Sequence, residues 1–258
     1  MDLNKKVAIV TGGASGLGFA TCKALVKQGC LVCIFDFNQE NGQQALQQLG
    51  PDNALFIQVD VTDEASVESA ITQCINQYKA LHIIVNCAGI GPPAKVLNRE
   101  GEPLALESFK QIINVNLFGT FNVLSKGAAH MAKGDTMNDD GGRGVIINVA
   151  SVAAFDGQIG QPAYAASKAG IVGMGLPIAR EFARYGIRVN TIAPGLFRTP
   201  LAESLGEEVV ESLGGAVEYP KRLGEPSEFA KLVVHIAEND YLNGEVIRLD
   251  GAIRMAAK

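Results

Sequence analysis

Hydrophobic and polar positions alternate in blocks along the whole chain. Short apolar runs, such as Val7–Val10 and Leu31–Phe35, are separated by longer stretches in which apolar residues recur at helical spacing. The short runs indicate buried strands and the periodic stretches indicate helices. The pattern predicts strands near 6–11, 31–35, 54–59, 81–86, 144–149, 187–193 and 245–249, and helices near 16–28, 39–49, 63–78, 104–132, 161–185 and 226–238.

Alternation of strands and helices with nearly continuous apolar strands is typical of a parallel sheet covered on both faces. No linker or low-complexity tract divides the 258 residues. We therefore expect one α/β domain over 1–258, a doubly wound, Rossmann-like fold with seven parallel strands and helices on both faces. A cofactor-binding half would span about 1–150 and a catalytic and substrate-binding half about 151–258. Ligands of such sheets bind beyond the carboxyl ends of the strands.

A glycine-rich turn follows the first predicted strand. Gly12, Gly16 and Gly18 lie between this strand and a helix, where glycines let the backbone approach a pyrophosphate and the helix N-terminus favours its charge. Their spacing differs from the commoner G-x-G-x-x-G. Asp36 ends the second strand about 20 residues later, where an acid meets the ribose hydroxyls. Because this carboxylate would repel a 2′-phosphate, we expect NAD rather than NADP.

A second group of residues predicts the chemistry. Tyr164 and Lys168 stand one helical turn apart if residues 161 onward are helical. A phenol has a pKa near ~10, and a neighbouring ammonium would lower it. The hydroxyl of Ser151, arriving from the preceding strand, would hydrogen-bond the oxygen that gains or loses the proton. This set predicts interconversion of an alcohol and a carbonyl beside a hydride carrier.

From about residue 5 to the C-terminus the chain resembles the short-chain dehydrogenase/reductase family. The resembling motifs occur in one order: Thr11-Gly-x-x-x-Gly-x-Gly18, Asp60-Val61, Asn86-Cys-Ala-Gly89, Asn116, Ser151, Tyr164-x-x-x-Lys168 and Pro194-Gly195. Further runs, including 143–148, 151–155, 192–197 and 243–255, are similar to those of the type 2 3-hydroxyacyl-CoA dehydrogenases, also called type 10 17β-hydroxysteroid dehydrogenases.

The resemblance implies a role for each catalytic residue. Tyr164 would be the acid/base, and Ser151 would orient the substrate oxygen. Lys168 would hold the nicotinamide ribose, and Asn116 would support a water-linked proton relay, although an asparagine in mid-helix can also be simply exposed. Gln158 would contact substrate, together with Ser151 and Tyr164.

The resemblance also implies a set of cofactor contacts along the carboxyl edge of the sheet. These residues are Gly12, Ser15, Gly16, Leu17, Gly18, Asp36, Asp60, Val61, Asn86, Cys87, Ala88, Gly89, Tyr164, Lys168, Pro194, Gly195, Phe197 and Thr199. Asp60 has an alternative interpretation, as the cap of the helix that starts near Asp63.

The implied substrate is a short- or branched-chain 3-hydroxyacyl-CoA. Alternative substrates are a steroid or other hydrophobic alcohol and a 3-oxoacyl-carrier protein. Asp36 disfavours the carrier protein, because such reductases usually require NADPH. The chain could also be an NAD-binding scaffold without catalysis. The glycine-containing stretch from Arg198 to Leu223 is expected to be a mobile lid. Arg198, Lys221 and Arg222 flank it, either to meet CoA phosphates or as solvated surface charges.

Composition excludes several classes. The net charge of −5 argues against nucleic acid as a partner, and no apolar run reaches the ~18 residues that span a membrane. The chain enters its first strand almost at once, so we expect a cytoplasmic protein. Five cysteines have no framework spacing, and Cys30-Leu-Val-Cys33 is interpreted as core rather than a redox or zinc site. The three histidines are scattered, so no metal is expected. The family resemblance implies a homotetramer.

Overall fold

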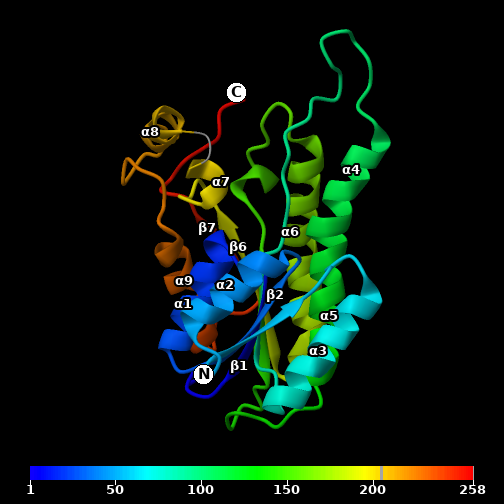
Figure 1. The fold of residues 1–258 in the computed structure, drawn as a ribbon, viewed down its shortest axis with the longest axis vertical. Coiled ribbons are helices and arrows are strands. Elements are labelled where there is room, and N and C mark those ends of the chain that lie inside the picture. Colours follow the sequence, from blue (N-terminus) through cyan, green and yellow to red (C-terminus); the bar gives the residue numbers. More distant parts are fainter. Residues whose placement is uncertain (204–205, 258) are drawn as a thin grey trace.

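Seven parallel strands form the central sheet of the computed structural model, which describes residues 1–203 and 206–257 (Figure 1). The strands are β1 Val7–Thr11, β2 Leu31–Asp36, β3 Ala54–Gln58, β4 Ile83–Asn86, β5 Gly144–Val149, β6 Ile187–Pro194 and β7 Val246–Leu249. Their order is β3-β2-β1-β4-β5-β6-β7. The fold predicted from the sequence is confirmed.

The strand order reverses between β1 and β4, because the chain runs outward from β1 to β3 and then returns to place β4 on the other side of β1. Connections leave the two strands in opposite directions at this point, which opens a crevice at their carboxyl ends. The glycine turn after Thr11 and the segment after Asn86 both emerge there.

Helices cover both faces of the sheet. They are α1 Gly16–Lys27, α2 Gln39–Leu49, α3 Glu64–Tyr78, α4 Leu106–Ile113, α5 Gly119–Met131, α6 Pro162–Phe182, α7 Pro200–Glu203, α8 Glu207–Gly215 and α9 Pro226–Glu238. One core cluster joins the sheet to α1, α2 and α9 through residues such as Leu25 and Phe229. The other joins it to α3, α5 and α6 through Ile71 and Val123.

The helix predicted over 104–132 contains a wider turn. A π-helical turn, Asn114–Phe118, separates α4 from α5, and such an insertion changes which side chains face the core. Asn116 is fully buried there. The alternative in which it is an exposed helix residue is therefore wrong.

The lid region differs from the expected loop, because it contains α7 and α8. Helix α8 was not recognisable from the sequence, because glycines interrupt the helical pattern at both of its ends. Gly206 precedes the helix with a φ of 92°, and Gly214–Gly215 end it. Val210 on α8 is nevertheless buried, and α8 lies against α7.

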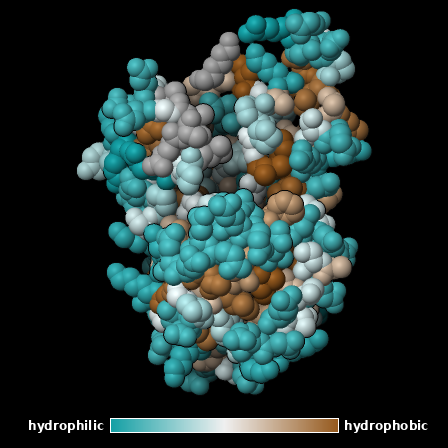
Figure 2. All heavy atoms as spheres, in the orientation of Figure 1, coloured by the Kyte–Doolittle hydropathy of each residue, from teal (hydrophilic) through white to brown (hydrophobic). Residues whose placement is uncertain are grey.

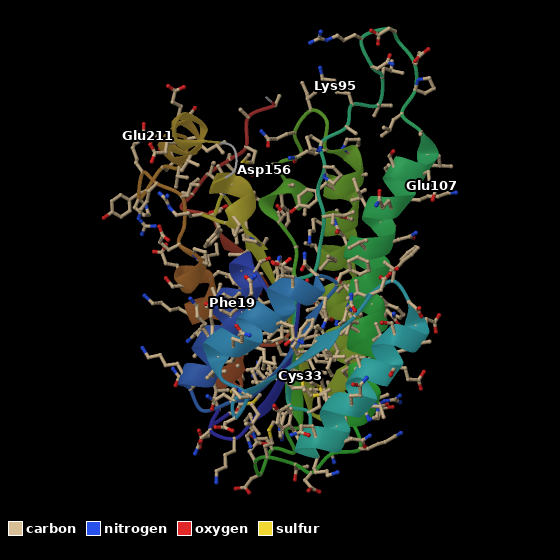
Figure 3. All side chains as sticks on the ribbon, viewed as in Figure 1. Phe19, Cys33, Lys95, Glu107, Asp156 and Glu211 are labelled. Atoms are coloured by element: carbon tan, nitrogen blue, oxygen red, sulfur yellow. The ribbon has the colours of Figure 1, made fainter. Side chains whose placement is uncertain are left out.

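The two cysteines of the C-x-x-C run face opposite sides of the sheet, because Cys30 belongs to one core cluster and Cys33 to the other. Burial raises the pKa of Cys30 to about 12 and also raises that of Cys33, which lies deep in the molecule (Figure 3). Both thiols are therefore core groups. Within the described residues no helix combines the length and apolar character needed to cross a bilayer.

Candidate active site

A cavity of about 740 Å³ lies at the reversal point of the sheet, and in the space-filling view a recess opens above α2 (Figure 2). The predicted cofactor residues that line the cavity come from the turn after β1 and the ends of β2, β3 and β4. They are Gly12, Ser15, Gly16, Leu17, Gly18, Asp36, Asp60, Val61, Cys87, Ala88 and Gly89, joined by Thr199. Segments far apart in the sequence therefore meet at one place.

The glycine turn leaves its backbone open to a pyrophosphate, because side chains at Gly12 and Gly18 would crowd neighbouring backbone atoms. Gly12 has a φ of 60°, and a Cβ there would lie 3.0 Å from the backbone of Ala88. A Cβ at Gly18 would collide with the carbonyl oxygen of Gly12. Ser15 precedes α1 with no side-chain capping bond, which leaves the first amides of α1 available. Such amides bind anions.

The acidic end of the cavity fits a ribose with free hydroxyls. Asp36 accepts hydrogen bonds from the backbone amides of Ala14 and Asn38, both at 3.0 Å, so its carboxylate is held against the glycine turn. The charged side chains among the described lining residues are Asp36, Asp60 and Glu107, all acidic. A 2′-phosphate on a ribose bound beside Asp36 would be repelled by this carboxylate.

Asp60 is not the cap of α3. Its Oδ1 accepts from the amide and hydroxyl of Thr62, at 2.9 and 2.7 Å. Asp63 caps the helix instead, accepting from the amides of Ala65 and Ser66. Asp60 therefore shapes the turn beside the cavity.

Some lining residues were not identified from the sequence: Phe35, Phe37, Val59, Thr62, Ile90, Glu107, Gln111, Asn114, Val115 and Pro200. Phe37 and Thr62 follow identified residues directly, and adjacency alone would have found them. Glu107, Gln111 and Asn114 follow one face of α4 at spacings of four and three. Their spacing in the sequence shows that these residues share one helix face, but nothing in the sequence indicates that this face closes the cavity.

The remaining predicted cofactor residues lie outside the cavity lining. Asn86 is buried and donates to Oδ1 of Asn148 at 2.9 Å, which joins β4 to β5. Pro194 ends β6 farther along the sheet, and Gly195 follows it. The ring of Phe197 packs edge-on against Phe229 with 6.2 Å between centroids. Its side chain is thus part of the core.

Tyr164, Ser151 and Lys168 converge beside the cavity. Ser151 lies two residues beyond the end of β5, and its hydroxyl is close enough to Tyr164 to lower the pKa of the phenol. Lys168, 4% exposed, donates from Nζ to the carbonyl oxygen of Val149 at 2.9 Å, and Nζ lies 5.7 Å from the centre of the tyrosine ring. A Cβ on Gly89 would lie 3.4 Å from this Nζ, so the ammonium reaches the segment that lines the cavity.

Burial governs the titration of this group. It raises the pKa of Tyr164, although the hydrogen bond from Ser151 lowers it in part. Burial also lowers the pKa of Lys168 to about 8. The expected lowering of the phenol pKa by Lys168 is absent in this geometry, and Ser151 provides the lowering instead. Tyr164 is therefore a neutral phenol at neutral pH.

Asn116 joins the π-helical turn to the catalytic helix. Its Oδ1 accepts from the amide of Ile90 at 2.8 Å, and its Nδ2 donates to the carbonyl of Ile90 at 2.8 Å and to Ser167 Oγ at 3.0 Å. Ser167 donates in turn to the carbonyl of Tyr164 at 2.7 Å. The asparagine thus fixes the segment after β4 relative to α6.

The other predicted contacts lie at the edge of the site. The Gln158 amide donates to the carbonyl of Ala256 at 3.1 Å, so it is engaged by the C-terminal segment. Arg222 binds Glu228 through two hydrogen bonds of 2.8 Å, and Arg198 lies 3.4 Å from Glu225. These ion pairs favour a structural role for both arginines over phosphate binding.

Comparison with known proteins gives consistent matches. The family model described as short chain dehydrogenase matches residues 6–210. The chain is 52% identical to human 3-hydroxyacyl-CoA dehydrogenase type-2 over 96% of its own length and 95% of that protein. It is 50% identical to the Drosophila melanogaster protein of the same name, over 98% and 99%. The crystal structure of 3-hydroxyacyl-CoA dehydrogenase type-2 from Mycobacterium avium superposes with a TM-score of 0.93 at 40% identity, covering 100% of both chains.

Proposed function

The chain belongs to the short-chain dehydrogenase family, and from this premise we propose that it interconverts a 3-hydroxyacyl-CoA and a 3-oxoacyl-CoA with NAD. It is an oxidoreductase of a small-molecule substrate that uses a nicotinamide dinucleotide, as its family and relatives indicate. The finer statement of substrate rests on the names of its relatives. The observation that carries the reaction is the convergence of Ser151, Tyr164 and the buried Lys168 beside the cavity.

NAD is proposed because of the cavity's charge. Asp36 would take the adenosine ribose, and no basic residue is found among the described lining residues to meet a 2′-phosphate. Gly12, Gly16 and Gly18 would admit the pyrophosphate at the start of α1. When bound, the cofactor supplies or accepts the hydride.

The chain's own residues move the proton. In the direction of reduction, the neutral Tyr164 phenol donates its proton to the oxygen that becomes a hydroxyl. In the direction of oxidation, Tyr164 Oη takes the proton from the substrate hydroxyl. Ser151 Oγ orients the reacting oxygen, because its hydroxyl lies beside the phenol. Lys168 and Asn116 hold the surrounding backbone, at Val149 and Ile90.

Three other functions were considered. A steroid or other hydrophobic alcohol would use the same chemistry, and the substrate assay below distinguishes it. A 3-oxoacyl-carrier-protein reductase using NADPH is disfavoured by Asp36. A scaffold without catalysis is disfavoured by the convergence of Ser151, Tyr164 and Lys168. The homotetramer and the cytoplasmic location stay predictions.

The test is a panel of reductions followed by loss of nicotinamide absorbance. Acetoacetyl-CoA, a steroid ketone and an acetoacetyl carrier protein would each be offered with NADH and with NADPH. We expect the highest kcat/KM with acetoacetyl-CoA and NADH. A preference for the steroid, the carrier protein or NADPH would contradict the proposal, and tight NADH binding with no turnover of any substrate would favour the scaffold.

A further inference from the structure

Arg248 on β7 joins two segments that are far apart in the sequence. Its guanidinium donates to Asp156 at 2.6 Å through Nη2, to Asp250 at 2.7 Å through Nε, and to the carbonyl of Ile253 at 3.1 Å. It also lies over the ring of Phe155, 5.3 Å from the centroid. Its side chain is 22% exposed and that of Asp156 is 16% exposed, so the pair is largely shielded from water. Shielded, multiply bonded charge pairs are sensitive to loss of either partner.

The C-terminal segment lies along the loop that connects Ser151 to Tyr164. Ile159 donates from its amide to the carbonyl of Ala257 at 2.9 Å, and the Gln158 side chain donates to the carbonyl of Ala256 at 3.1 Å. Figure 3 shows Asp156 beside the C-terminal segment. Two adjacent residues of the loop are therefore bonded to residues 256 and 257.

A short chain of bonds links Asp156 to the catalytic serine. The amide of Asp156 donates to the carbonyl of Val152 at 2.9 Å. Val152 directly follows Ser151 in a single 3₁₀ turn, and Ser151 Oγ accepts from the amide of Ala153 at 3.1 Å. Displacement of Asp156 would thus displace the turn that orients the serine hydroxyl.

We infer that Arg248, through its ion pair with Asp156, is a positioning residue for Ser151 and Tyr164. The inference rests on the proposed function, because it concerns the two catalytic hydroxyls. Strand β7 and the C-terminal segment hold these hydroxyls in their relative positions. A lysine cannot replace Arg248 fully, because one ammonium cannot reproduce the forked donation to Asp156 and Asp250 together.

The test compares Arg248→Met and Asp156→Asn with a matched control, Arg254→Met. Arg254 also bonds Asp250 and the carbonyl of Ile253, but it has no bond to Asp156 and is 64% exposed. We expect the first two variants to lose at least about tenfold in kcat, since small misplacements of catalytic groups have effects of this order or larger. Asp156→Glu should retain more activity than Asp156→Asn, because it keeps the charge. NADH affinity should stay within about twofold in every variant, since the hydrogen-bond partners of Arg248 are not among the described residues that line the cofactor cavity.

Two further readouts separate positioning from general destabilisation. Hydrogen exchange should increase in residues 151–161 of Arg248→Met, while residues 11–18 exchange as in the wild type; this measurement needs no substrate. The rise of the oxidation rate with pH should occur at higher pH, as in Ser151→Ala, and Arg248→Met should add no further shift in a Ser151→Ala background.

Unchanged kcat in Arg248→Met, parallel loss of NADH affinity, or exchange that increases equally at 11–18 would each overturn the inference. If the wild type turns over no acyl-CoA, the proposed function fails instead, and the exchange pattern still decides whether Arg248 holds the loop.

Discussion

Lys168 donates a hydrogen bond from Nζ to the carbonyl oxygen of Val149 over 2.9 Å, and Val149 is the last residue of the strand that delivers Ser151. The end of β5 therefore orients two members of the catalytic set, the serine through the chain and the lysine through a hydrogen bond. Because Lys168 is almost completely buried, this carbonyl is its principal partner in the structure described here.

Replacing Lys168 by Met should reduce both turnover and cofactor affinity. The change removes the buried ammonium that reaches Gly89 at the cavity, and it leaves the Val149 carbonyl without its donor. We expect kcat to fall by about 10²-fold or more and NADH to bind more weakly. Steady-state kinetics and fluorescence titration of NADH measure the two effects. The control is Lys126→Met, which removes a lysine paired with the exposed Glu64; equal losses in both variants would show that charge alone, not position, matters.

Ser151→Ala should move the pH dependence of oxidation. The pKa of Tyr164 is raised by burial and lowered in part by Ser151, so loss of the serine hydroxyl raises this pKa further. Oxidation needs a phenolate, so its rate should rise with pH, and in Ser151→Ala the rise should occur at higher pH. The charged group that faces the phenol, Lys168, is unchanged in both proteins. Profiles of kcat against pH that coincide would contradict the assignment of Ser151.

Gly18→Ala should damage the cofactor site. Its Cβ would collide with the carbonyl oxygen of Gly12, so the turn must shift, at a cost of about 1–3 kcal/mol in the free energy of unfolding. NADH affinity should fall as well, because the same turn admits the pyrophosphate. Gly173→Ala is the control, since a Cβ there meets open space within α6, and alanine stabilises a helix interior. Wild-type NADH affinity in Gly18→Ala would place the pyrophosphate elsewhere.

His82 should make the protein less stable as pH falls. Burial, aided by Lys6, lowers its pKa from 6.5 to about 4, and its Nδ1 accepts from the amide of Val7 at 3.0 Å. Between pH 6.5 and about 4, the unfolded chain therefore binds a proton at His82 that the folded chain does not bind. The free energy of unfolding consequently decreases as pH falls through this window.

The test for His82 is urea unfolding at several pH values. His82→Asn keeps an acceptor for Val7 but does not titrate, so its stability should depend less on pH between 6.5 and 4. The same change at the exposed His235 serves as the control. An equal pH dependence in wild type and His82→Asn would exclude His82 as the cause.

The strands were predictable because fully buried strands require continuous apolar runs, and each strand lies within two residues of its expected bounds. The pairing of Tyr164 with Lys168 followed from helical spacing. The π-helical turn that buries Asn116 was not predictable, because a single inserted residue leaves the helical pattern almost unchanged. The burial of Phe197 against Phe229 depends on packing between distant segments, which no local pattern reports.

The direction of the Tyr164 pKa shift also could not be predicted from the sequence. Spacing placed an ammonium near the phenol and suggested a lowered pKa. Burial opposes this effect and is larger, and the depth of a side chain emerges only when the whole fold is assembled. The lid helices could not be predicted for a different reason, since they are short and glycines flank the longer one.

The central claim, that Tyr164 Oη transfers the proton, is tested most directly by Tyr164→Phe assayed with acetoacetyl-CoA and NADH. The variant keeps the ring that packs against Gly91 and loses the reacting hydroxyl. We predict that it folds, binds NADH with wild-type affinity, and loses about 10²- to 10⁴-fold in kcat. Turnover within a few-fold of the wild type would contradict the mechanism.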